Sequence, residues 1–139
     1  MKKFLLFLFF LTYSFNSMAH MAHYNKFNKI EMEILRDDEV IGYNYYFFKK
    51  EKDNTIVTNQ LKFTVKLFGA TIFEVESYGE EKYIKEKWIS FNSKNRQNKK
   101  EKYVKLKLNE EKNEYDIKGS SYTGSASIEN VIGNWWSHK

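Results

Sequence analysis

Strict alternation of apolar and polar residues is the feature of this sequence that most constrains its fold. It is clearest in "TIVTNQLKFTVKLFG", residues 55–69, where Val57 and Phe63 share one parity while Gln60 and Lys62 share the other. Because successive side chains of a β-strand point to opposite faces of the sheet, this pattern predicts a strand with one buried and one solvated face.

Shorter segments repeat the alternation along most of the chain. Examples are "NKIEMEI", "TIFEVESYG" and "KYVKLKLN", and polar turn signals such as Asp37-Asp38 and Asp53-Asn54 separate segments of this kind. We predict about seven short strands and no amphipathic helix beyond the N-terminus. The expected fold is all-β, an antiparallel meander that forms one curved sheet or half-barrel after an N-terminal signal helix. Such a sheet must cover its apolar face by curling, by a second layer or by a ligand.

The first 19 residues have the three parts of an export signal. Two lysines precede an apolar run from Phe4 to Phe15, and small residues follow at Ser17 and Ala19. An apolar run of roughly a dozen residues is too short to span a bilayer as a helix. We predict a signal peptide, 1–19, cleaved near Ala19, and a single β-sheet domain, 20–139, that is periplasmic or secreted. The alternatives are an uncleaved anchor and a buried core helix.

The charge balance gives no reason to expect a nucleic-acid partner. Lys2 and Lys3 belong to the predicted signal, so 21 of the 23 Lys and Arg remain, against 18 Asp and Glu. This balance is only mildly basic. The sequence has no Cys, so it can form neither a disulfide nor a lipid-modified N-terminal cysteine. Aromatic residues make up 18% of the chain and must supply much of the buried apolar area.

Three stretches resemble an uncharacterised bacterial family. They are "RDDEVIGYNYYFF" (36–48), with an acidic turn before Ile-Gly and an aromatic strand, "EKWISF" (86–91) and "NWWSHK" (134–139). The resemblance is to a domain-of-unknown-function family of exported, β-rich envelope proteins, and it implies a half-barrel-like fold with no established activity. Members of that family continue past the tryptophan stretch. We therefore expect this chain to be either a shortened member or, as we favour, a fragment of a larger domain.

Candidate catalytic groups are sparse. Nucleophilic catalysis needs a Ser, Thr or Cys beside a positioned base, and "GSSYTGSAS" (119–127) lacks the strand-turn-helix setting of a nucleophile elbow. The carboxylates are scattered, and Glu74 and Glu76 fall on the polar parity of their strand. The family resemblance singles out Glu86, for which we expect a structural role. We therefore predict a protein that is not an enzyme and that needs no cofactor.

The aromatic strands are the strongest indication of a function. They carry more ring area than the core of a small domain requires, so an open sheet lined with these rings would hold an apolar or lipid ligand. The alternative is an ordinary core. The predicted ligand-contact residues are Tyr45, Phe47, Phe63, Phe73, Trp88, Trp135 and Trp136.

A basic run in the second half of the chain suggests a second type of contact. Lys99, Lys100 and Lys102 belong to this run, in which Glu101 is the one acid between residues 94 and 107. These lysines are candidates for contact with an anionic lipid surface. We favour the alternative, a solvated hairpin whose lysines protect a strand edge from pairing with other chains.

Two other functions remain open. An exposed sheet edge would let the protein act as a structural module that recruits an envelope protein partner. Cleavage after Ala19 would place His20 at the mature N-terminus, where its α-amine and imidazole, with His23 or His138, would form a nitrogen ligand set suited to Cu(II). The alternative for these histidines is chance occurrence in an N-terminal tail.

Overall fold

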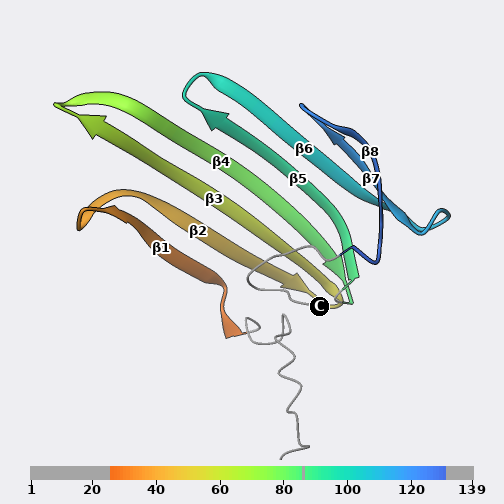
Figure 1. The fold of residues 1–139 in the computed structure, drawn as a ribbon. Helices are drawn as coiled ribbons and strands as arrows, with labels where there is room; N and C mark the ends of the chain where they lie inside the picture. Colours follow the sequence, from red (N-terminus) through yellow and green to blue (C-terminus); the bar gives the residue numbers. More distant parts are fainter. Residues whose placement is uncertain (1–25, 86, 131–139) are drawn as a thin grey trace, which may run out of the picture.

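The computed structural model describes residues 26–85 and 87–130, which form one curved antiparallel sheet (Figure 1). Its eight strands follow the order of the chain, so each strand pairs with the next. The strands are β1 Lys29–Arg36, β2 Glu39–Glu51, β3 Asn54–Leu67, β4 Ala70–Ile84, β5 Lys87–Gln97, β6 Lys100–Asn109, β7 Glu114–Gly119 and β8 Thr123–Ser127. The predicted all-β class and antiparallel meander are confirmed. The predicted signal helix lies outside the described residues.

The sheet has one strand more than the sequence predicted. The additional strand is β8, whose residues "TGSAS" are small and lack the apolar alternation that marks the other strands. It pairs with β7 through partners such as Tyr115 and Ala126, so neighbouring backbone decides its conformation. Within the described part of the chain, β1 and β8 are the two edges of the sheet.

Tight turns connect the strands where the sequence carries polar or glycine signals. The β1–β2 turn has positive φ at both Asp37 and Asp38, and the β3–β4 turn has positive φ at both Phe68 and Gly69. Positive φ at both central residues is the mark of the type I′ turn, whose twist matches that of a hairpin. The β2–β3 turn lies at residues 52–53, one position before the predicted Asp53-Asn54 signal.

Cross-strand register assigns each side chain to one of two faces. We call the face that carries Tyr46, Phe48, Val57 and Tyr83 the inner face, and the opposite one the outer face. Directly opposed residues share a face. One complete row of the inner face crosses seven strands through Phe48, Val57, Glu81, Phe91, Leu106, Ile117 and Gly124.

The core lies at one end of the inner face. It consists of Tyr46, Phe48, Val57 and Tyr83, against which Ile30, Met32 and Trp88 pack. Val57 is its most buried member, with 1% of its surface exposed. Every strand described belongs to the same sheet, so no second layer built from these residues packs on the inner face. In the same residues we find no helix with the length and apolar character needed to cross a bilayer.

Close approach of β2 and β3 explains the glycine of the Ile-Gly pair. Gly42 lies opposite both Ile34 on β1 and Phe63 on β3. A Cβ added at Gly42 would overlap the Lys62 carbonyl oxygen and the Phe63 backbone. Backbone atoms cannot move aside as a flexible side chain can, so only glycine fits this position.

We predict that Gly42→Ala lowers the free energy of unfolding of the full chain by about 2 kcal/mol, because the added methyl forces β2 and β3 apart. Gly79→Ala is the matched control. A Cβ at Gly79 would meet the Phe91 ring at an ordinary 3.5 Å. Urea unfolding followed by circular dichroism measures both, and equal losses in the two variants would contradict the close approach.

Candidate ligand-binding face

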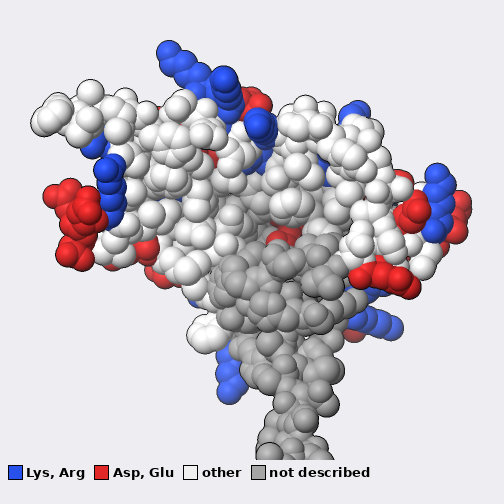
Figure 2. All heavy atoms as spheres, viewed as in Figure 1, with Lys and Arg blue, Asp and Glu red and all other residues white. Residues whose placement is uncertain are grey.

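The inner face continues beyond the core as a half-buried apolar surface. In the part of Figure 2 that grey atoms do not cover, most of the visible residues are uncharged, and most of the Lys, Arg, Asp and Glu side chains lie toward the margin. Far from the core, the rings of Phe63 and Phe73 lie 5.8 Å apart beside Val65 and Val75. Both rings are only half-buried. The inner face therefore has two apolar zones, the core and this second aromatic zone.

A band of polar side chains separates the two zones. Asn59 donates from Nδ2 to the Asn44 Oδ1, 2.5 Å away, and to the Tyr45 carbonyl oxygen. Asn44 in turn donates to the Tyr46 hydroxyl at 3.3 Å. By register, Ser77 and Ser93 extend the band across β4 and β5. A ligand lying along the strands would thus meet apolar, polar and again apolar surface.

A buried carboxyl lies at the border between the core and the polar band. Glu81 is 6% exposed and accepts a hydrogen bond from the Tyr83 hydroxyl. It stands in the row between Val57 and Phe91. From the sequence alone the carboxylates are described as scattered, and Glu81 is not singled out. Its position in the strand could have revealed that Glu81 faces inward. Glu81 is six residues after Val75 and two before Tyr83, so it shares the parity of these two apolar, inward-facing residues.

Trp88 supplies a hydrogen-bond donor in the same region. Its ring packs against the core, and Tyr115 approaches it edge-on with ring centroids 5.3 Å apart. The Tyr115 hydroxyl donates to the Trp88 carbonyl oxygen at 3.3 Å, and burial raises the pKa of that phenol, with Lys87 opposing the shift. The Trp88 Nε1–H is buried and finds no acceptor among the residues described. An unsatisfied buried donor is costly, so it is a natural contact for a ligand oxygen.

The structure divides the predicted ligand-contact residues between the two faces. Phe63, Phe73 and Trp88 lie on the inner face, whereas Tyr45 and Phe47 point to the outer face. One ligand on one face cannot contact both groups. Trp135 and Trp136, like His20, His23, His138 and Glu86, lie outside the described residues.

The outer-face aromatics form a row of their own. Tyr43 and Tyr45 stack with centroids 5.8 Å apart and an interplanar angle of 5°, and Phe47 continues the row. The Lys29 ammonium lies 5.0 Å from the Tyr45 centroid. This cation–π contact and the stacking give the aromatic row a structural role that does not require a ligand.

The predicted lysines occupy two positions. Lys99 is in the β5–β6 turn, and Lys100 and Lys102 lie on the inner-face parity of β6, opposite Gln97 and Asn95. All three are exposed.

A separate hollow of about 650 Å³ lies over the outer side of β5 to β8. No predicted contact residue belongs to its lining, which consists of Ile89, Ser90, Asn92, Lys105, Leu106, Lys107, Asp116, Ile117, Lys118, Thr123 and Gly124.

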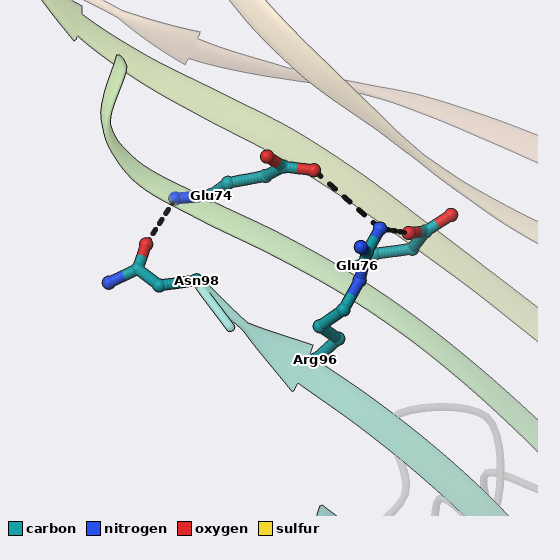
Figure 3. A network of polar contacts seen from close by, with 4 residues as sticks. All are labelled: Glu74, Glu76, Arg96 and Asn98. Carbon is teal, nitrogen blue, oxygen red and sulfur yellow. Dashed lines mark hydrogen bonds and ion pairs between the residues drawn. The ribbon is translucent and has the colours of Figure 1, made fainter. Parts of the chain in front are cut away.

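A polar network on the outer face joins β4 to β5 (Figure 3). Arg96 pairs with Glu76 and approaches the Glu74 carboxylate at 3.8 Å. Asn98 accepts from the Glu74 backbone N–H at 2.9 Å through its side chain, and its own N–H donates to the Glu74 carbonyl oxygen at 2.7 Å. The members are exposed, apart from the half-buried Glu74, so we assign them to strand pairing rather than to chemistry.

No cluster of His, Asp or Glu arranged to hold a metal ion occurs in residues 26–85 or 87–130.

The fold and its inner face define a single-sheet, all-β protein with one apolar, aromatic-rich surface. The chain belongs to the family described as Domain of unknown function (DUF6134), whose model matches residues 32–139. No curated protein matches the chain, and neither does any solved structure.

The Arg96–Glu76 pair predicts a specific acid response. The hydrogen bond and charge of Arg96, with a smaller contribution from Lys62, lower the pKa of the Glu76 carboxyl. A carboxyl whose pKa is lower in the folded state stabilises the protein above its unfolded pKa, and this contribution is lost as the pH falls through the folded pKa. We expect Glu76→Gln to lose less Tm than wild type between pH 6 and pH 3. Glu33→Gln, on the outer face of β1, is the control, and identical acid responses in all three proteins would rule out the assignment.

Proposed function

We propose that the protein binds an amphiphilic, lipid-like ligand on its inner face and acts as a non-enzymatic binding or carrier protein. The observation that carries the proposal is the half-burial of the apolar side chains beyond the core. Phe63, Phe73, Leu61, Ile34 and Phe91 all face inward from a single-layer sheet and remain partly exposed. A soluble domain seldom leaves so large an apolar surface uncovered unless something binds there.

The polar groups of the inner face indicate the kind of ligand. The Trp88 Nε1–H needs an oxygen acceptor, and an ester or amide carbonyl supplies one. The Trp88 donor therefore favours a ligand that carries an ester carbonyl, such as a monoacylglycerol.

We also propose that the protein acts outside the cytoplasm. The export signal pattern at residues 1–19 supports this location. Protein recovered from the envelope or medium of its cells is expected to begin at His20, next to the predicted cleavage site. N-terminal sequencing tests this, and an intact Met1 terminus would contradict the proposal.

Binding is expected to depend on inner-face rings and not on outer-face rings. We predict that Phe63→Gln and Phe73→Gln each weaken the binding of a fluorescent monoacylglycerol analogue to the full chain by about tenfold, which corresponds to about 1.4 kcal/mol. Tyr45→Gln is the matched control, since Tyr45 lies on the outer face, and its Kd is expected to stay within about twofold of wild type.

A second variant separates the polar contact from general packing. Trp88→Phe keeps an aromatic ring but removes the N–H donor. Unlabelled monoacylglycerol should therefore displace the fluorescent analogue from this variant about tenfold less effectively than from wild type. Displacement of the analogue by a plain alkane should be nearly unchanged. If wild type binds no analogue, or if Tyr45→Gln impairs binding as much as the inner-face variants do, the proposed site is wrong. Circular dichroism confirms that each variant is folded.

A further inference from the structure

The β3–β4 hairpin projects beyond the rest of the sheet. Pairing of β2 with β3 ends at Gly42 and Phe63, and pairing of β4 with β5 begins only at Val75 and Gln97. The β3–β4 ladder itself continues to Leu67 and Ala70. Residues 64–74 therefore form a two-stranded extension roughly 13 Å long, at about 3.3 Å per residue. In Figure 1 this hairpin extends past its neighbours at the upper left.

The tip of this hairpin is apolar and exposed. Phe68 is 99% exposed, Leu67 51% and Ile72 53%. Lys66 is the one charged residue between Thr64 and Phe73. Scattered apolar residues on a surface need no explanation, but three together at the end of a projecting hairpin mark an interaction site. We call Leu67, Phe68 and Ile72 the apolar tip.

Phe68 is unfavourable for the turn that it occupies. Its φ is +50°, and the following Gly69 has φ +82°. Two-residue turns of this kind prefer Asn-Gly or Asp-Gly, and positive φ is costly for a bulky side chain. The β1–β2 turn of the same protein uses Asp37 and Asp38 at the equivalent positions. With nearly all of its surface exposed, Phe68 adds no core burial to offset this cost, so turn formation and packing do not explain the residue.

A basic turn is bonded to the base of the hairpin. The two hydrogen bonds between Asn98 and Glu74 hold the β5–β6 turn against β4 (Figure 3). Lys99 and Lys100 follow Asn98, are exposed and make no ion pair within the described part of the chain. The acidic β1–β2 turn lies at the same end of the sheet, but pairing of β2 with β3 stops at Gly42, and among the described residues no hydrogen bond ties this turn to the hairpin.

We propose that the apolar tip inserts into the interface of an anionic phospholipid membrane, with Lys99 and Lys100 contacting lipid phosphates. Apolar residues of peripheral proteins enter the boundary between head groups and acyl chains to a depth of roughly 5–10 Å, which the projecting hairpin can reach. Each lysine near such a surface adds attraction that salt screens. This contact is independent of ligand binding on the inner face, so either proposal can fail alone.

The test uses the full chain and phosphatidylglycerol–phosphatidylcholine vesicles in a co-flotation assay. Phe68→Asn is the informative variant, because Asn tolerates positive φ and creates the favoured Asn-Gly turn. We expect this variant to have an unchanged or higher Tm and a partition coefficient into vesicles lowered about tenfold. A purely structural Phe68 would show the opposite, a lower Tm with unaltered partitioning.

Two further variants complete the experiment. Ile84→Asn removes a 46% exposed apolar residue at the other end of β4 and is expected to leave partitioning unchanged. The double variant Lys99→Gln, Lys100→Gln should bind more weakly and lose most of the salt dependence seen in wild type. Absence of wild-type binding to vesicles would overturn the proposal and would favour a protein as the binding partner of the apolar tip. Equal loss of binding in Ile84→Asn would overturn it too.

Discussion

Cross-strand register is the constraint on which the rest of this structure depends. Eight strands lie in one layer, so the alignment of each strand with the next decides whether apolar side chains gather on one face or scatter over both. The row from Phe48 through Val57 to Phe91 exists only because the four consecutive strands β2 to β5 pair in this one register. A slip by one position would move a whole strand's side chains to the opposite face.

A single layer also explains why candidate sites are concentrated on the inner face and at the strand ends. The inner face combines a tight core, a polar band and a second aromatic zone, whereas the outer face carries ion pairs and the stacked row beginning at Tyr43. Glu81 is the one charged residue buried in the described chain. A carboxyl inside an apolar row needs specific partners, and Tyr83 is one of them. The projecting β3–β4 hairpin is the corresponding feature at the sheet end, where pairing with neighbours has stopped.

Sequence reasoning reached the fold class and part of the candidate face. The alternation in β3 and β6 predicted the strands and their inward residues, because a period of two needs no knowledge of neighbours. Sequence reasoning could not assign faces where a continuous run of similar residues hides the alternation. In the continuous aromatic run of β2, Tyr45 and Phe47 could not be distinguished from Tyr46 and Phe48 without the pairing to β1 and β3. Glu81 was missed because the parity of this carboxylate was not examined, as it was for Glu74 and Glu76.

The sequence by itself determined that this protein is all-β, an antiparallel meander with one apolar face, because alternation and turn residues act locally. Tertiary structure decided which residues share that face. Trp88 and Phe91 have opposite parity, yet their rings lie 6.1 Å apart on the inner face because the β4–β5 register shifts between Lys82 and Tyr83. Tertiary structure also decided that β3 and β4 extend beyond the neighbouring strands β2 and β5, which leaves Phe68 exposed. Both outcomes depend on pairing between strands, which a linear sequence pattern does not contain.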